Sequence, residues 1–321
     1  MSVVKYFRLI YNGSRRYKKM WFWFSVAALL CWSGSDLFSK IGCQDAKDKY
    51  SHLKMVMAVG VVMGLHAAYE IFVGGVEINP EIILTYLPVS ALYILSMAIG
   101  YLGLRYIELS ISSPICNSSG AIVAILIFAT KGFGELPPIA LLAVALVCIG
   151  VVCLGITEAN EDEELRKARQ DACNHHYAKS WVAITLPIIY CLLDALGTFA
   201  DSKVLEVLNE DSANVAYELT FLAVGIVCAI YVLGVKKQRL IPKQEAPKYT
   251  GALFETAGQF AYIYALADAD HAALAAPIIS SYCVASVIWS RLFLKEKLSK
   301  KHYASVLVVI VGIVIIGILD I

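Results

Sequence analysis

The chain contains ten apolar stretches of membrane-spanning length, separated by short charged segments. A helix needs about 20 mostly apolar residues to cross the hydrocarbon core of a bilayer. The composition agrees, because 59% of the 321 residues are hydrophobic and 17% are charged, against roughly 45–50% and about 25% in soluble domains. We therefore expect an all-α membrane protein with ten transmembrane helices and no separate soluble domain.

The predicted helices cover residues 21–41, 53–75, 81–104, 107–130, 137–156, 180–203, 213–234, 247–267, 270–293 and 301–320. A long charged stretch, residues 157–179, divides the chain almost in half and predicts a solvated linker. On this division a basic N-terminal segment (1–20) precedes a first five-helix unit (21–156), and a second five-helix unit (180–321) follows the linker.

The two units resemble each other in sequence. A shift of 163 residues aligns Lys40 with Lys203, Tyr86 with Tyr249, Pro114 with Pro277 and Ser118 with Ser281. A unit with five spans is odd in number, so its copy must cross the membrane in the opposite orientation. The pattern predicts two inverted five-helix repeats (5+5), an architecture that secondary transporters build around a cavity near the middle of the bilayer.

Several motifs carry a family resemblance. They are the run from Trp32 to Lys40 (Trp-Ser-Gly-Ser-Asp-Leu-Phe-Ser-Lys), Ser113-Pro114 followed by Glu135, and the counterparts Ala276-Pro277 and Glu296. With the duplicated layout, they make the chain similar to EamA-type members of the drug/metabolite transporter superfamily. The resemblance covers essentially the whole chain. It implies ten helices, no bound cofactor, transport of small metabolites and both termini in the cytoplasm, but it does not fix a substrate.

The distribution of Lys and Arg leaves the orientation open. Six basic residues precede the first helix, which agrees with a cytoplasmic N-terminus at the cell membrane. The later loops point the other way, because Lys and Arg concentrate in the odd-numbered loops and the positive-inside rule would place those in the cytoplasm. We expect cytoplasmic termini, with the reversed orientation as the alternative.

Ionisable side chains deep in an apolar helix indicate function, since each costs at least about 2.5–3.5 kcal/mol to insert. Glu255 lies well inside the eighth predicted helix, and Gln259 and Tyr262 follow it at i+4 and i+7 on the same face. A carboxylate, an amide and an aromatic ring thus share one face. The alternative is a protonated carboxyl that only bonds a neighbouring helix.

The first and sixth helices each carry an aromatic residue four positions before an acid. These are Trp32 with Asp36, and Tyr190 with Asp194, although the 163-residue shift does not superpose the two pairs. Lys40 follows Asp36 by one turn, where snorkelling or a pair within the helix explains it. We interpret Asp201 as lying near a helix end and Glu218 as able to face interfacial water.

These side chains predict recognition of a small organic cation, because the deep charges are acidic and aromatic faces attract ammonium groups. Glu255 and Asp36 are the candidates for exchanging a proton against the cation. The predicted substrate-binding residues are Trp32, Asp36, Tyr93, Asn117, Tyr190, Asp194, Glu255, Gln259, Tyr262 and Tyr282.

The function we expect is transport of a choline-like amine or quaternary ammonium ion by alternating access. One alternative is a transporter of amino acids, nucleosides or other neutral or zwitterionic metabolites, and another is a non-transporting membrane scaffold. The sequence shows no catalytic motif and no metal-binding pattern, so we expect neither an enzyme nor a metal site. The net charge of +1 argues against a nucleic-acid partner. We expect a monomer or homodimer.

Overall fold

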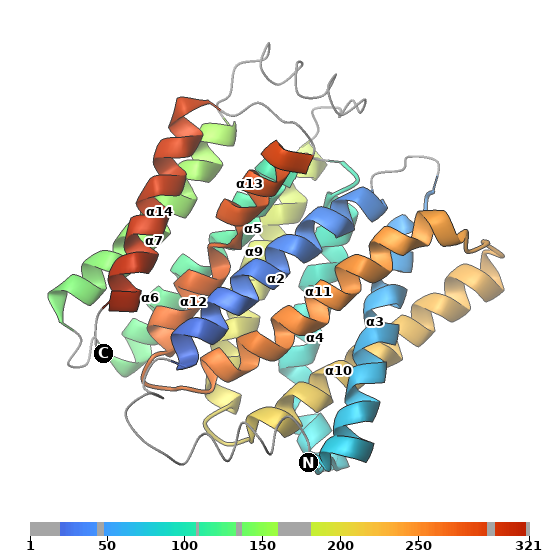
Figure 1. The fold of residues 1–321 in the computed structure, drawn as a ribbon. Coiled ribbons are helices and arrows are strands. Elements are labelled where there is room, and N and C mark those ends of the chain that lie inside the picture. Colours follow the sequence, from blue (N-terminus) through green and yellow to red (C-terminus); the bar gives the residue numbers. More distant parts are fainter. Residues whose placement is uncertain are drawn as a thin grey trace.

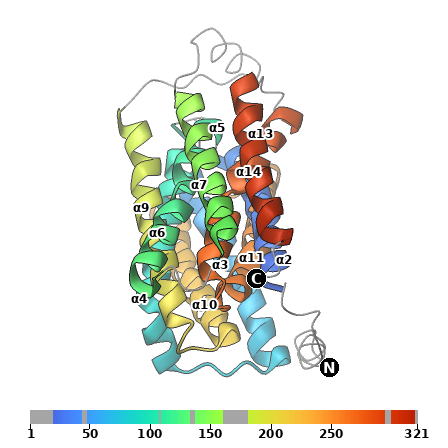
Figure 2. The same cartoon turned by 90° about the vertical axis from the view of Figure 1, so that its left-hand side faces the viewer.

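The computed structural model describes residues 20–43, 48–106, 109–132, 137–159, 181–293 and 299–318. Within these ranges every regular element is a helix (Figures 1 and 2). The basic N-terminal segment, apart from Met20, and most of the predicted linker lie outside the described residues, as do Glu135 and Glu296.

The first half of the chain folds into α2 (Met20–Cys43), α3 (Ser51–Tyr69) continued by the π-helix η2 (Glu70–Gly74), α4 (Pro80–Gly103), α5 (Leu109–Asn117), α6 (Ser119–Lys131) and α7 (Pro138–Ala159). The second half folds into α9 (Trp181–Val204), α10 (Glu210–Ala229) continued by the π-helix η3 (Ile230–Val235), α11 (Pro242–Leu266), α12 (Ala272–Ser280), α13 (Tyr282–Phe293) and α14 (Lys300–Ile318).

Most helix ends lie within a few residues of the predicted ones, and the larger differences have local causes. Helix α10 begins three residues early, because the Asn209 side chain accepts a hydrogen bond from the backbone N–H of Asp211 and caps the helix. Helix α11 begins at Pro242 rather than at residue 247, since a proline suits the first helical turn. Helix α7 runs to Ala159, three residues into the predicted linker.

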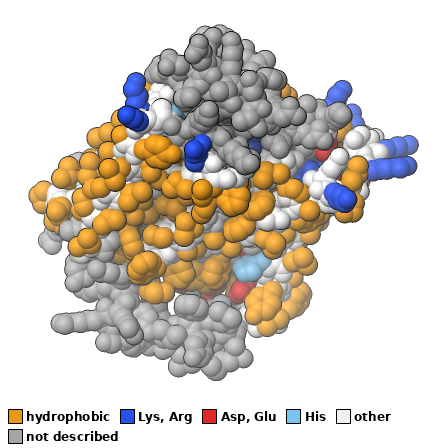
Figure 3. Space-filling model, turned by 45° about the horizontal axis from the view of Figure 1, so that its top comes forward, with side chains coloured by type: hydrophobic (Ala, Val, Ile, Leu, Met, Phe, Trp, Pro, Cys, Tyr) orange, Lys and Arg blue, Asp and Glu red, His pale blue; other side chains and the backbone are white. Residues whose placement is uncertain are grey.

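Five helical segments of the described chain are long and apolar enough to cross a membrane. They are Ser51–Gly74, Pro80–Gly103, Ser112–Thr130, Glu210–Val235 and Ala272–Phe293. In Figure 3, hydrophobic side chains cover the middle of the visible face, and Lys and Arg side chains lie in its upper half and at its right-hand edge. The protein is therefore a multi-pass membrane protein. The number of ten spans and the inverted orientation of the halves stay predictions.

The fourth and ninth predicted helices are each interrupted by one residue, although each still forms a helical segment long enough to cross a membrane. The breaks fall at Ser118, between α5 and α6, and at Ser281, between α12 and α13. Each serine hydroxyl donates back to the preceding turn, Ser118 to the carbonyl of Pro114 at 2.9 Å and Ser281 to that of Ile278 at 2.6 Å. Such bonds compete with the helical pattern, and the upstream prolines, Pro114 and Pro277, have already removed one helical donor each.

Helices of the first half pack along helices of the second half. The main pairs are α2 with α11, α3 with α10, α4 with α9 and α7 with α14. Where α3 crosses α10, two glycines meet: a Cβ added to Gly60 would lie 2.9 Å from the carbonyl oxygen of Phe221 and 3.0 Å from the Cα of Gly225. Only glycine allows the two backbones to approach this closely.

Replacing Gly60 by Ala is expected to lower the stability of the folded protein by about 1–3 kcal/mol, the usual cost of overpacking. The added methyl group would meet backbone atoms, which cannot rotate away as a side chain can. Thermal unfolding of the purified protein in detergent measures the effect. Gly234→Ala is the matched control, because a Cβ at Gly234 has no atom within 4 Å; equal melting temperatures for the two variants would contradict the prediction.

Candidate functional site

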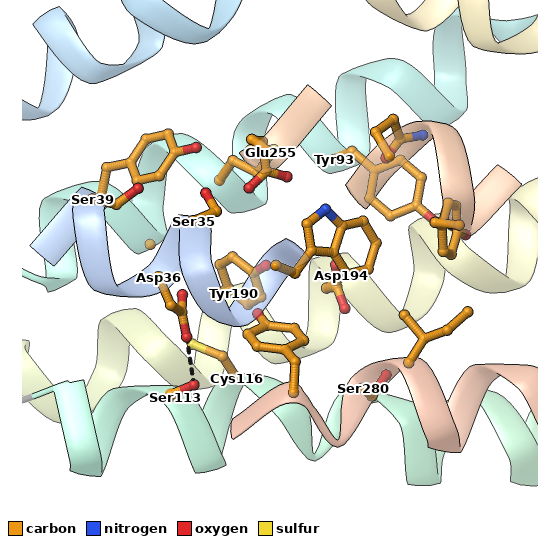
Figure 4. A pocket seen from close by; sticks show the side chains of 18 of the residues that line it. Ser35, Asp36, Ser39, Tyr93, Ser113, Cys116, Tyr190, Asp194, Glu255 and Ser280 are labelled. Carbon is orange, nitrogen blue, oxygen red and sulfur yellow. Dashed lines mark hydrogen bonds between the residues drawn. The ribbon is translucent and has the colours of Figure 1, made fainter. Parts of the chain in front are cut away.

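A cavity lies among α2, α4, α5, α9, α11, α12 and α13, and we call it the central cavity. Its lining includes Tyr217 of α10, so helices of both halves enclose it. The broken helices contribute from both sides, with Ser112, Ser113 and Cys116 on α5 and Ala276, Ile279 and Ser280 on α12. Figure 4 shows these elements crossing close together around the cavity.

Three carboxylates line the central cavity, one from each of three helices: Asp36 on α2, Asp194 on α9 and Glu255 on α11 (Figure 4). Asp36 Oδ2 accepts hydrogen bonds from Ser113 Oγ at 2.6 Å and Ser286 Oγ at 3.1 Å. Asp194 Oδ2 accepts one from Ser119 Oγ at 2.7 Å. None of the described lining residues is Lys, Arg or His, so the titratable charge facing the cavity is acidic.

Aromatic rings line the same cavity and pack against one another. The Trp32 ring lies 5.1 Å from the Tyr262 ring and 6.0 Å from the Tyr282 ring, between ring centroids. The Tyr93 and Tyr262 rings meet edge to face at 6.0 Å, and their hydroxyls are hydrogen-bonded. Tyr93 also donates to Thr198 Oγ1 at 3.0 Å. These contacts hold the rings in fixed positions at the edge of the cavity.

The central cavity brings together nine of the ten predicted site residues. Asn117 does not line it: its Nδ2 donates to the backbone carbonyl of Ser113 at 2.6 Å, within α5. Lys40 also differs from the expectation of snorkelling, because it is buried and its Nζ donates to the carbonyl of Leu104 at 2.8 Å. Asp36 accepts its hydrogen bonds from serine hydroxyls of α5 and α13.

Glycines on facing helices make room for two of the rings. Trp32 lies over Gly258, where an added Cβ would come within 2.4 Å of the indole, and Tyr190 lies over Gly100, where the corresponding distance is 2.8 Å. The two pairs are related by a shift of 158 residues, which also relates Asp36 to Asp194. The register of the repeat therefore slips by five residues around the site, which is why a shift of 163 does not align these residues.

Two acidic residues are more deeply buried than their sequence positions indicate. Asp201 is 0% exposed and accepts a hydrogen bond from the Tyr86 hydroxyl at 2.8 Å. Glu218 is also 0% exposed, and His66 Nδ1 lies 2.8 Å from its Oε1. The interpretation of Glu218 as facing interfacial water is therefore wrong. His66 thus bonds a carboxyl of a neighbouring helix. The described residues contain no group of three side chains able to hold a metal ion.

The cavity residues of the second half, from Tyr190 to Tyr282, lie in a segment whose sequence matches a family model. Residues 181–318 match the model described as the EamA-like transporter family. No curated protein matches the chain. A crystal structure described only as "Crystal structure of protein" has a similar fold, with a TM-score of 0.62 and 12% identity over 94% of this chain and 96% of that one. The second half of the chain, residues 181–318, is therefore similar in sequence to the EamA-like transporter family.

Proposed function

We propose that this protein is a secondary transporter that moves a small organic cation through the central cavity. The observation that carries the proposal is the charge of the lining: three carboxylates, Asp36, Asp194 and Glu255, with no basic side chain among the described lining residues. A cation entering such a cavity replaces lost hydration by direct attraction to these groups, which is strong where little water screens it.

The aromatic lining supports the same class of substrate. Trp32, Tyr190, Tyr262 and Tyr282 line the cavity together with the carboxylates. The face of an aromatic ring carries partial negative charge, so rings grouped around a carboxylate favour ammonium ions through cation–π attraction. A quaternary ammonium ion of the size of choline presents methyl groups that can pack against several such rings.

The proposed mechanism is alternating access by two inverted five-helix repeats. The helix pairs support this mechanism. In chain order, α2, α3, α4 and α7 of the first half correspond to α9, α10, α11 and α14 of the second half. The contact of α2 with α11 therefore has its counterpart in the contact of α9 with α4, and the pairs α3–α10 and α7–α14 each join two corresponding helices. The glycines of α7 and α14 show the same reciprocity, since Gly150 meets Val309 and Gly312 meets Val147. Rocking of one repeat against the other, with Ser118 and Ser281 at the helix breaks, would open the cavity to one side at a time.

We further propose that the transporter lies in the cell membrane with both termini in the cytoplasm. A proton exchanged at Glu255 or Asp36 would couple transport to the proton gradient, because both carboxyls line the cavity where a cation would bind.

A thermal-shift screen of the purified protein tests the substrate class. A ligand that binds only the folded state raises the melting temperature. We expect small amines and quaternary ammonium ions to raise it, and amino acids without a net positive charge and nucleosides to have smaller effects. Stabilisation by nucleosides or neutral metabolites alone would overturn the proposal in favour of the alternative substrate class.

Gly258→Ala is expected to weaken cation binding by about tenfold or more, because an added methyl group would push the Trp32 ring out of its place beside the cavity. Binding of choline, measured by isothermal titration calorimetry, checks this. Gly234→Ala, which places a methyl group in open space, serves as the control. Equal affinities for the two variants would show that the position of Trp32 does not matter for binding.

A further inference from the structure

Two hydrogen-bond donors at the central cavity have no partner in the protein. They are Tyr101 Oη and Gln259 Nε2, and both residues line the cavity. Gln259 is 3% exposed and Tyr101 is 6% exposed, so bulk water does not reach them freely. Buried polar groups are nearly always hydrogen-bonded, and a group without a partner in the protein calls for another one.

The Gln259 amide lies close to a carboxylate of the cavity. Gln259 follows Glu255 by one turn of α11. Residues four apart on a helix have Cβ atoms about 5–6 Å from each other. The Trp32 ring also packs over Gly258, the residue before Gln259, which brings the indole of α2 next to the amide of α11.

These polar atoms do not contribute to the stability of the fold. A phenylalanine at position 101 or an aliphatic residue at position 259 would fill the same space without burying a donor that lacks a partner. The other hydroxyls and acids of the lining show the contrast, because Tyr93, Ser113 and Asp36 all bond within the protein. The unpaired donors are therefore available to form hydrogen bonds with a molecule that enters the cavity.

We infer that the substrate carries an oxygen acceptor, a hydroxyl, carbonyl or carboxylate, a few bonds from its positively charged nitrogen. This inference rests on the proposed function. The carboxylates bind the charged nitrogen, and Gln259 and Tyr101 donate to the oxygen. A purely aliphatic ammonium ion leaves the donors without a partner and binds less tightly, so the donors select within the class of organic cations.

Isothermal titration calorimetry with two cations of similar size and equal charge tests the inference. Choline carries a hydroxyl where propyltrimethylammonium carries a methyl group. We expect the wild-type protein to bind choline at least about tenfold more tightly, because sites built to hydrogen-bond a substrate reject an analogue that lacks the group. In Tyr101→Phe and Gln259→Leu the ratio of the two affinities is expected to fall, while affinity for propyltrimethylammonium changes little.

Matched controls separate this role from a structural one. Tyr106→Phe and Gln238→Leu change exposed residues of the same types and should keep the wild-type ratio. The melting temperature of ligand-free Tyr101→Phe should stay equal or rise, since the variant removes a buried hydroxyl that has no partner in the protein.

The possible outcomes distinguish the two proposals. Equal affinity of the wild-type protein for both cations means that water alone satisfies the donors; it overturns the inference and leaves the proposed function standing. Failure of both cations to bind overturns both. A lowered ratio in the two cavity variants, with an unchanged ratio in the controls, supports the inference.

Discussion

Replacing Glu255 by Gln is expected to reduce uptake of choline into proteoliposomes by about 100-fold. Gln keeps the size and shape of the side chain and removes its charge. Two opposite charges 4 Å apart attract each other by about 4 kcal/mol at an effective dielectric constant of 20, and Asp36 and Asp194 compensate for part of that loss because they line the same cavity.

The matched control for Glu255→Gln is Glu81→Gln, which changes an exposed acid in the first turn of α4. Uptake by the control should equal that of the wild-type protein. Unchanged uptake by Glu255→Gln would remove Glu255 from the binding site. Uptake that persists but no longer responds to a pH gradient would instead assign Glu255 to proton exchange and leave cation binding to the two aspartates.

Replacing His66 by Ala is expected to lower stability by about 3 kcal/mol, the low end of the cost of breaking a buried ion pair. The low end applies because the His66 side chain is 29% exposed, whereas Glu218 is 0% exposed. The pair connects α3 with α10, and Glu218 keeps only the weaker hydrogen bond from Asn214 Nδ2, at 3.2 Å, when His66 is removed. Denaturation of the purified protein in detergent measures the loss.

Two further variants make the His66 prediction specific. The double variant His66→Leu with Glu218→Leu should recover most of the stability, since it also removes the Glu218 carboxyl that His66→Ala leaves without its closest partner. Lys203→Ala breaks an ion pair with Glu206 that is 39% and 40% exposed, and it should cost less than about 1 kcal/mol. A double variant as unstable as His66→Ala would contradict the explanation.

The helices of the described chain were largely predictable from the sequence, because their apolar stretches are long and charges mark their ends. The breaks were not. Pro114 and Pro277 indicate a weakened helix, but the interruption occurs four residues later, at Ser118 and Ser281. The position of the interruption depends on serine hydroxyls that donate to carbonyls of the preceding turn. The apolar periodicity of the sequence does not indicate where such bonds form.

The candidate site was predictable where burial of charge is costly. Asp36, Asp194 and Glu255 stand out in the sequence for that reason, and the structure groups them around one cavity. Asn117 was included because amides recognise ligands, but sequence does not reveal that its amide bonds the turn before it. Glu218 was misjudged because its burial depends on His66, which lies 152 residues away in the chain.

Binding of choline compared with 3,3-dimethyl-1-butanol tests the central claim most directly. The two molecules share size, shape and hydroxyl group, and only choline carries a positive charge. If the three carboxylates recognise a cation, choline binds and the neutral alcohol binds at least about 100-fold more weakly, with the difference shrinking in Glu255→Gln. Equal binding of the two molecules by the wild-type protein would contradict the claim that this cavity selects a cation.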